Sequence, residues 1–265
     1  GGYVYYIASP DNFTQRYLYR SRLDGTGEAE RVSPAAMSGQ HSYQISADAK
    51  YAIHSFENAQ TPRRISLIDL STHKEIKLLE DNTALKARIS ELGLRPKEFI
   101  KVDIGPVVLD AWMIKPKNFD AAKKYPVIFH VYGEPAGSTV QDNWGTGDNL
   151  WHHYLANELN CIVISIDNRG TRLPRGRAFR KSIYRQIGLL AADDQAAAAK
   201  KIMATYPFID SAHTGIWGWS GGGQMSLHCI FRHGDIFKTA IAVAFVADQT
   251  LYDNIYQERY MGLPQ

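Results

Sequence analysis

The segment Gly215-Ile216-Trp217-Gly218-Trp219-Ser220-Gly221-Gly222-Gly223 decides the fold that the sequence predicts. Its first residues are typical of a buried strand, and the pattern from 222 to 233 predicts a helix. Ser220 therefore lies at the turn between strand and helix, with Gly218 and Gly222 two residues to either side. Such a tight turn needs small residues at both positions. The segment predicts a serine held in a strained turn at a helix N-terminus.

A strand, a serine and a helix in this order form the nucleophile elbow of the α/β-hydrolase fold. We therefore predict that Ser220 is a nucleophile, since free N–H groups at a helix start favour developing negative charge. The backbone N–H of Gly221 is the first predicted donor of the oxyanion hole. The second should come from the loop Tyr132–Gly137, where the Tyr132 hydroxyl is the candidate. Taken alone, Tyr132 fits a packed aromatic residue better.

Strands and helices alternate from residue 98 onward, which predicts a doubly wound α/β sheet with helices on both faces. We expect a hairpin of strands 99–104 and 107–114 at its start. Further strands are expected at 126–132, 161–166, 214–217 and 238–244, and helices at 149–159, 187–206 and 222–233.

The first part of the chain has a different pattern, rich in Tyr and β-branched residues. Short strands are expected at 3–8, 15–22, 30–33, 43–47, 51–57 and 64–69, which predicts all-β structure. The spacing resembles β-propeller blades, with an independent β-meander as the alternative. The predicted domains are the last part of a propeller at residues 1–90 and an α/β-hydrolase domain at residues 91–265.

Composition narrows the classes of function. The chain has 265 residues, 45% of them hydrophobic, and a net charge of +3 with dispersed Lys and Arg, so we expect no nucleic-acid partner. No apolar run reaches about 18 residues, so no membrane span is expected. Cys161 and Cys229 lie in apolar runs and are predicted to be buried and unpaired. We expect no cofactor and no metal, and we interpret the adjacent His152 and His153 as ordinary surface or loop histidines.

We expect both ends of the chain to lie within a longer protein, and we expect residues 260–265 to form no terminal helix. An α/β-hydrolase orders its triad Ser, then Asp or Glu, then His, so we expect the acid and the base beyond residue 265. His228 and His233 lie on the helix that begins at the serine and should not reach it. Asp248 and Asp253 are expected to be caps or turn residues.

Four motifs carry a family resemblance: residues 130–135 (HVYGEP), 166–170 (IDNRG), 217–223 (WGWSGGG) and 256–264 (YQERYMGLP). Together they resemble the dipeptidyl peptidase IV branch of the prolyl oligopeptidase family. The resemblance implies a serine exopeptidase that removes N-terminal dipeptides with Pro or Ala at the second position, and a propeller that restricts access. It also implies that Ser220 is the nucleophile and that Tyr132 and Gly221 form the oxyanion hole.

The resemblance further implies a pocket for the proline ring, lined by Val246, Tyr252 and Tyr256, to which we add Trp219. Two positions depart from the family pattern. Gly221 replaces a tyrosine, and Gln249 replaces a pocket tryptophan, so the pocket should be wider or more polar.

The sequence leaves three hypotheses for the function: a dipeptidyl peptidase, an acylaminoacyl peptidase or esterase of the same fold, and a non-catalytic relative that binds peptides. The resemblance favours a periplasmic or secreted enzyme and allows a homodimer of a longer protein.

Overall fold

The computed structural model describes residues 2–145 and 147–263, and the chain forms two compact units. The first unit comprises Gly1–Pro96 with Gln141–Asn149, and the second comprises Lys97–Val140 with Leu150–Gln265. The predicted domain boundary between residues 90 and 91 stays a prediction.

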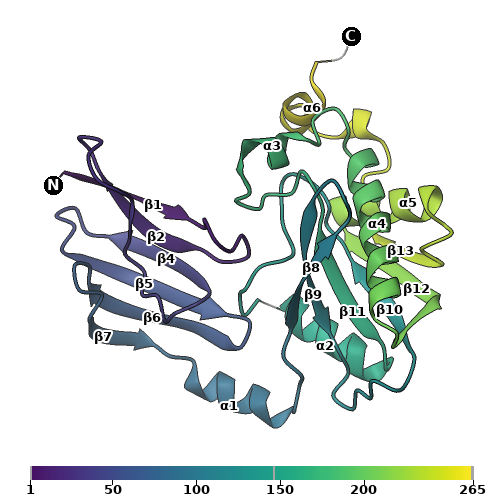
Figure 1. The fold of residues 1–265 in the computed structure, drawn as a ribbon, viewed down its shortest axis with the longest axis horizontal. Helices are drawn as coiled ribbons and strands as arrows, with labels where there is room; N and C mark the ends of the chain where they lie inside the picture. Colours follow the sequence, from purple (N-terminus) through teal and green to yellow (C-terminus); the bar gives the residue numbers. More distant parts are fainter. Residues whose placement is uncertain (1, 146, 264–265) are drawn as a thin grey trace. The chain divides into compact units, whose positions relative to one another are not determined.

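The first unit is built from two antiparallel sheets (Figure 1). One contains β1 (Tyr3–Ala8), β2 (Tyr17–Arg22) and β3 (Glu30–Arg31), and the other contains β4 (Gln40–Ile45), β5 (Tyr51–Asn58), β6 (Thr61–Asp69) and β7 (Glu75–Glu80). Leu18, Ala52, Ile68 and Leu70 form the core between them. A four-stranded antiparallel meander is the unit of a propeller blade, so the predicted propeller fold is confirmed.

Two elements of the first unit were not predicted, namely β7 and the helix α1 (Thr83–Glu91). All six side chains of β7 are exposed, and α1 buries no residue. The alternation of Glu75, Ile76, Lys77 and Leu78 was a short signal for β7 that the prediction did not use, whereas α1 has only a weak amphipathic pattern.

The second unit contains a six-stranded sheet in the order β13-β12-β10-β11-β9-β8. The hairpin of β8 (Glu98–Asp103) and β9 (Val108–Ile114) is antiparallel, as predicted. The other four strands run parallel: β10 (Tyr125–His130), β11 (Ile162–Asp167), β12 (Ile209–Trp219) and β13 (Thr239–Val243). β13 forms one edge of this sheet.

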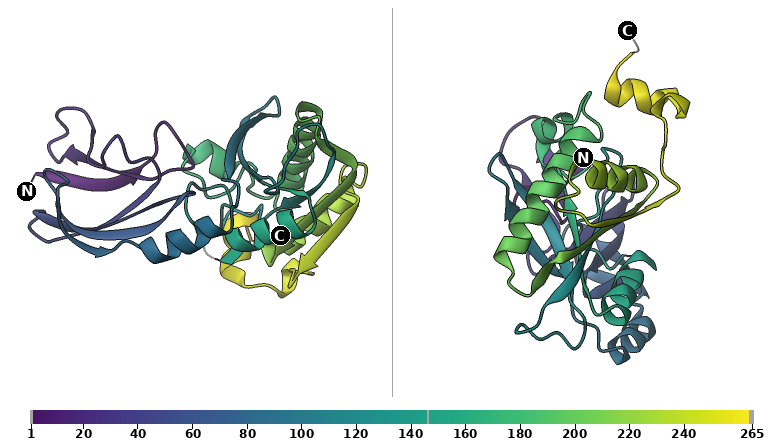
Figure 2. Two further views of the ribbon diagram at one scale, coloured as in Figure 1. Left: turned by 90° about the horizontal axis from the view of Figure 1, so that it is seen from below. Right: turned by 90° about the vertical axis from the view of Figure 1, so that its right-hand side faces the viewer.

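Helices cover both faces of this sheet (Figure 2). On one face, α2 (Gly147–Glu158) packs Ala156 against Trp112 and Val163. On the other face, the Ala-rich α4 (Leu189–Thr205) and α5 (Gly221–Arg232) form the larger core with Phe129 and Ile216. The α/β-hydrolase architecture predicted from the sequence is confirmed.

The prediction for His152 and His153 was wrong, because both side chains are buried within α2. His152 packs between the rings of Trp112 and Trp217, with centroids 5.2 and 5.6 Å away. Burial lowers the pKa of His152 to about 2 and that of His153 to about 4, so both are neutral. Adjacent helical residues point about 100° apart, and both can fall within a wide buried stripe.

The expectation of no helix near the C-terminal end was also wrong, because α6 spans Asn254–Met261. It buries none of its residues, which explains the absence of an amphipathic signal. Residues 264 and 265 lie outside the described residues.

Cys161 and Cys229 are buried and unpaired, as predicted. No helix within residues 2–145 and 147–263 is both long and apolar enough to cross a bilayer. In the same part of the chain, no group of three or more His, Cys, Asp or Glu side chains is arranged to hold a metal ion.

Candidate active site

Ser220 connects β12 to α5 and has an unusual backbone conformation, with φ 57° and ψ −119°. A non-glycine residue in such a region typically costs about 1–3 kcal/mol and persists only where its surroundings hold it. Here the Ser220 N–H donates to the carbonyl of Val243 at 2.9 Å, and its carbonyl accepts from the N–H of Gln224 at 3.1 Å. The strained turn predicted from the sequence is therefore present.

Gly218 and Gly222 allow this turn because there is no room for a side chain at either position. A Cβ on either residue would clash with the carbonyl oxygen of Val131, which follows β10. Any larger residue would push the end of β12 away from the end of β10. The two glycines thus keep the serine turn against the neighbouring strand.

Tyr132 lies at the same edge of the sheet as Ser220. β10 and β12 run parallel with His130 opposite Trp217, and the N–H of Val131 donates to the Trp217 carbonyl at 3.0 Å. A Cβ placed on Gly222 would lie 3.2 Å from the Tyr132 Cα. The structure thus brings the two residues together, since the carboxyl ends of parallel strands meet at one edge.

The Tyr132 side chain is half-buried, and its ring packs on the backbone of Gly137, where a Cβ would approach within 2.8 Å. Burial, followed by the nearby carboxyl of Glu134, raises the pKa of Tyr132. Its hydroxyl therefore keeps its proton at neutral pH and is able to donate a hydrogen bond.

Glu134 is a site residue that the sequence reasoning missed. Its side chain is only 5% exposed, and its carboxyl group lies where a Cβ on Gly221 would be. The Tyr256 hydroxyl donates to Glu134 Oε2 at 2.6 Å. Burial raises the pKa of Glu134, against the effect of this hydrogen bond, and burial together with the Glu134 charge raises the pKa of Tyr256. The missing side chain at 221 is what admits this carboxyl.

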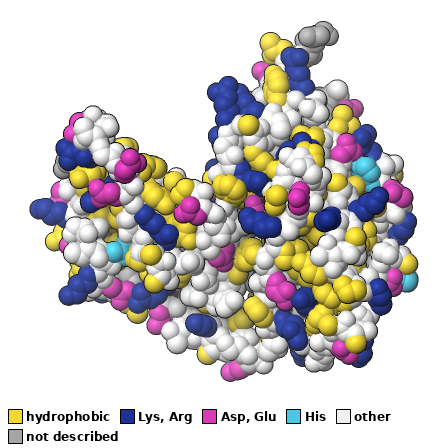
Figure 3. Space-filling view, viewed as in Figure 1, with side chains coloured by type: hydrophobic (Ala, Val, Ile, Leu, Met, Phe, Trp, Pro, Cys, Tyr) yellow, Lys and Arg dark blue, Asp and Glu magenta, His cyan; other side chains and the backbone are white. Residues whose placement is uncertain are grey.

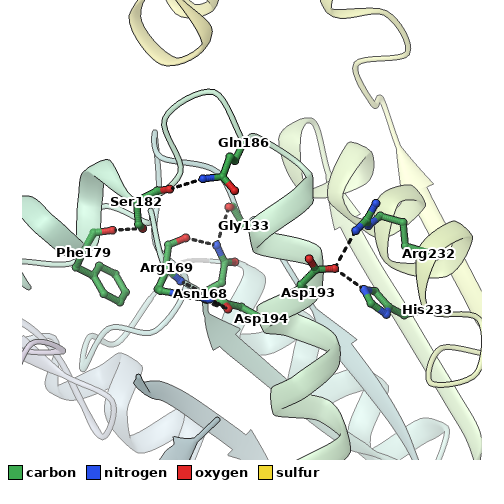
Figure 4. A network of polar contacts seen from close by, with 10 residues as sticks. All are labelled: Gly133, Asn168, Arg169, Phe179, Ser182, Gln186, Asp193, Asp194, Arg232 and His233. Carbon is green, nitrogen blue, oxygen red and sulfur yellow. Dashed lines mark hydrogen bonds and ion pairs between the residues drawn. The ribbon is translucent and has the colours of Figure 1, made fainter. Parts of the chain in front are cut away.

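Asn168, which follows β11, holds the backbone of the Tyr132 loop (Figure 4). Its Nδ2 donates to the Gly133 carbonyl at 3.0 Å, and its Oδ1 accepts from Gln195 at 3.0 Å. Next to it, Arg169 forms a bidentate ion pair with the buried Asp194 of α4. This network connects the candidate oxyanion loop to the body of the second unit.

Four of the candidate pocket residues, Val246, Gln249, Tyr252 and Tyr256, lie in the chain between β13 and the end of α6, and the fifth, Trp219, ends β12. Tyr256 packs edge-on against Tyr252 and Tyr260, with ring centroids 5.3 and 4.9 Å apart. Gln249, in the 3-10 helix η1 (Gln249–Leu251), donates to Gln224 of α5 at 2.7 Å. Val246 is partly buried in the preceding loop, whereas Trp219 is 62% exposed at the end of β12. Tyr256 is thus tied to Glu134 beside Gly221, while Trp219 faces largely into solvent.

Comparison with known proteins identifies the two parts of the chain. Residues 148–265 match the model of the prolyl oligopeptidase family, and residues 1–63 match that of the dipeptidyl peptidase IV N-terminal region. The chain belongs to the dipeptidyl peptidase IV branch of the prolyl oligopeptidase family.

Several members of this family align with the whole chain. A probable dipeptidyl-aminopeptidase B of Emericella nidulans is 36% identical over 100% of this chain and 29% of its own length. A probable dipeptidyl-aminopeptidase B of Arthroderma gypseum is 32% identical over 99% of this chain and 28% of its own length. The crystal structure of Porphyromonas gingivalis dipeptidyl peptidase 4 superposes with a TM-score of 0.91 at 36% identity, covering 99% of this chain and 36% of that one. The crystal structure of a putative dipeptidyl aminopeptidase IV of Bacteroides ovatus superposes with a TM-score of 0.76 at 25% identity. It covers 99% of this chain and 45% of that one. The chain thus spans less than a third of the curated relatives' length.

Four titratable residues that follow the serine have partners other than Ser220, namely His228, His233, Asp248 and Asp253. His233 Nε2 lies 2.9 Å from Asp193, and His228 lies 3.5 Å from the Gln224 amide. Asp248 caps η1 and Asp253 caps α6, each accepting a backbone N–H at 2.8 Å, so the prediction that they are caps is confirmed.

Glu134 and Asn168 stand inside two of the motifs that carry the family resemblance. The sequence therefore contained a signal for both residues. Their contacts join segments far apart in the chain, such as Glu134 and Tyr256, whose positions differ by 122, and no local pattern reveals such a pairing.

Proposed function

We propose that this chain supplies the nucleophile and the oxyanion hole of a serine exopeptidase that removes N-terminal dipeptides with Pro or Ala at the second position. Support comes from its membership of the dipeptidyl peptidase IV branch and from the names of its relatives, which are dipeptidyl-aminopeptidases. The conformation of Ser220 at the strand–helix turn is the observation that carries the proposal.

In the proposed reaction, the Ser220 Oγ attacks the carbonyl carbon of the second residue of the peptide. Its proton passes to a histidine base, which we place, with its acid partner, beyond residue 265. The Gly221 N–H and the Tyr132 hydroxyl donate to the oxyanion of the tetrahedral intermediate. The C–N bond then breaks, the remaining peptide leaves as an amine with the proton from the base, and water hydrolyses the acyl-enzyme.

The proposed pocket for the second residue of the substrate is lined by Tyr252, Tyr256, Val246 and Trp219. Aromatic faces suit the flat apolar ring of proline. Gly221 adds no side chain, and Gln249 adds an amide that is bonded to Gln224. These departures support acceptance of alanine as well as proline.

The test uses the full-length protein that carries this chain. We expect it to release p-nitroaniline from Ala-Pro and Ala-Ala anilides, and Ser220→Ala to abolish release. A fluorophosphonate probe should add its mass to the peptide that contains Ser220. Labelling of a different residue, or full activity of Ser220→Ala, would contradict the proposal.

The same assay separates the alternatives. A preference for acetyl-alanine anilide or simple esters over Ala-Pro anilide indicates an acylaminoacyl peptidase or esterase. Peptide binding without turnover or probe labelling indicates a non-catalytic relative.

A further inference from the structure

A cavity of about 1010 Å³ lies in the second unit, beside the candidate oxyanion loop. Pro135 and Ala136 of that loop form part of its wall, and Arg259 and Tyr260 of α6 form another part. The remaining lining comes from the segment 170–184, which contains α3 (Gly176–Lys181). Figure 3 shows Lys and Arg side chains gathered over α3 on this face of the molecule.

The charged residues that line this cavity all carry positive charge: Arg172, Arg177, Arg180, Lys181 and Arg259. None of the five forms an ion pair with a carboxylate within residues 2–145 and 147–263. Two neighbouring arginines differ in this respect, because Arg169 pairs with Asp194 at 2.6 Å and Arg175 with Asp110 at 3.5 Å. Five unpaired cations around one hollow repel one another and create a local field that attracts anions.

Arginine dominates the lining, and this favours carboxylates as the ligand. A guanidinium group offers a rigid fork of donors that matches a carboxylate in a bidentate geometry. Apolar side chains, such as that of Ile183, complete the wall and suit the rest of a peptide chain. A cavity with apolar walls and a few converging polar groups has the character of a binding site.

The position of the cavity relates it to the proposed reaction. Gly137 packs against the Tyr132 ring and accepts a hydrogen bond from the Arg172 N–H at 3.0 Å. Tyr260 packs on Tyr256, which is bonded to Glu134. Pro135 and Ala136, which line the cavity, follow Tyr132 by three and four residues in the same loop, so the cationic wall adjoins the loop of the proposed oxyanion donor.

We propose that this cationic cavity binds carboxylate groups in the part of a peptide that follows the scissile bond. The proposal rests on the proposed dipeptidyl peptidase function and adds a preference for acidic substrates. Carboxylates can come from Asp and Glu side chains or from the free C-terminus of a short peptide.

The experiment measures kcat/KM of the full-length protein on peptides that begin Ala-Pro and continue with acidic, neutral or basic residues, each with a free or an amidated C-terminus. We expect the acidic peptides to be favoured, and the advantage to shrink at high salt. A gain from the free C-terminus alone assigns the cavity to the terminal carboxylate, whereas a gain from Asp and Glu in amidated peptides assigns it to side chains.

The double variant Arg177→Ala/Arg180→Ala should reduce the advantage of acidic over neutral peptides by about tenfold, because it removes two of the five cations. Hydrolysis of Ala-Pro anilide, which has no peptide after the bond, should be unchanged. Lys200→Ala/Lys201→Ala, two exposed lysines of α4 outside the cavity, is the matched control and should keep the advantage.

Binding of a fluorescent acidic peptide to the Ser220→Ala protein separates this proposal from the proposed function. Loss of binding in the Arg177/Arg180 variant supports the cavity even if no substrate is hydrolysed. The proposal fails if acidic peptides gain nothing over neutral ones, if the control variant behaves like the cavity variant, or if an oligonucleotide or anionic vesicles bind more tightly than the acidic peptide.

Discussion

At the scale of single residues, the main feature of this site is the packing of Gly221, the glycine after Ser220, against the buried Glu134. A side chain at 221 and the carboxyl of Glu134 exclude each other, because both require the same space. Glu134 in turn accepts the Tyr256 hydroxyl. The residue next to the nucleophile therefore controls the position of an aromatic residue on α6.

Replacing this glycine tests the connection. Gly221→Ala should lower kcat/KM on Ala-Pro anilide by about 100-fold, because displacing Glu134 and Tyr256 by about 1 Å misplaces the substrate. The double variant Gly221→Ala/Glu134→Ala should recover part of the loss, since the added methyl group then meets no carboxyl. If the two substitutions are additive in steady-state kinetics, the residues do not compete for space.

Tyr132→Phe removes the proposed side-chain donor of the oxyanion hole and keeps the ring that packs on Gly137. We expect kcat to fall about 100- to 1000-fold with little change in KM, because the lost hydrogen bond forms in the transition state. Unchanged unfolding temperature is the control for structure. Wild-type kcat in this variant would assign the second donor to another group.

The sequence predicted elements well where their burial follows a regular period, and poorly where it does not. β10, β11, β12 and α4 each bury several residues, and each was predicted within a few residues, apart from the earlier start of β12. β7, α1 and α6 bury no residue, so their formation depends on neighbours that a local pattern cannot reveal. The serine turn was predictable because its glycines lie within two residues of the serine. The hydrogen bond from Tyr256 to Glu134 was not predictable, because its two residues are far apart in the chain.

A cluster of three histidines in the first unit predicts that the blade formed by β4–β7 is sensitive to acid. His41 Nδ1 lies 2.9 Å from His54 Nε2, and the Tyr43 hydroxyl lies 2.8 Å from His73 Nε2. Burial lowers the pKa of His41 to about 4 and that of His54 to about 3, from an ordinary value of 6.5, and nearby charges add to the effect.

The unfolded blade binds more protons than the folded one between pH 6.5 and about 4. Stability should therefore be greatest above pH 6.5 and fall as the pH drops through this window, by about 1.4 kcal/mol per unit of pKa depression. In His54→Phe, the thermal unfolding temperature should fall less as the pH is lowered through this window. In His213→Gln, a change at an exposed position, it should fall as in the wild type. An equal pH slope in all three proteins would contradict the prediction.

At the scale of the whole molecule, the chain contains two compact units and less than a third of the length of its curated relatives. The proposed triad acid and base lie beyond residue 265. The purified 265-residue chain should therefore hydrolyse Ala-Pro anilide at no more than about 1/1000 of the full-length rate. Turnover near the full-length rate that Ser220→Ala abolishes would show that a base lies within this chain.

The position of β13 at the edge of the six-stranded sheet has a consequence for handling the protein in solution. An open edge presents a row of backbone donors and acceptors that can template pairing with another molecule. Ile241 on this strand is 62% exposed, and Leu251 and Ile255, which follow the strand in the chain, are 85% and 82% exposed. The purified 265-residue chain should aggregate as its concentration rises, and Ile241→Lys should raise the concentration at which light scattering begins.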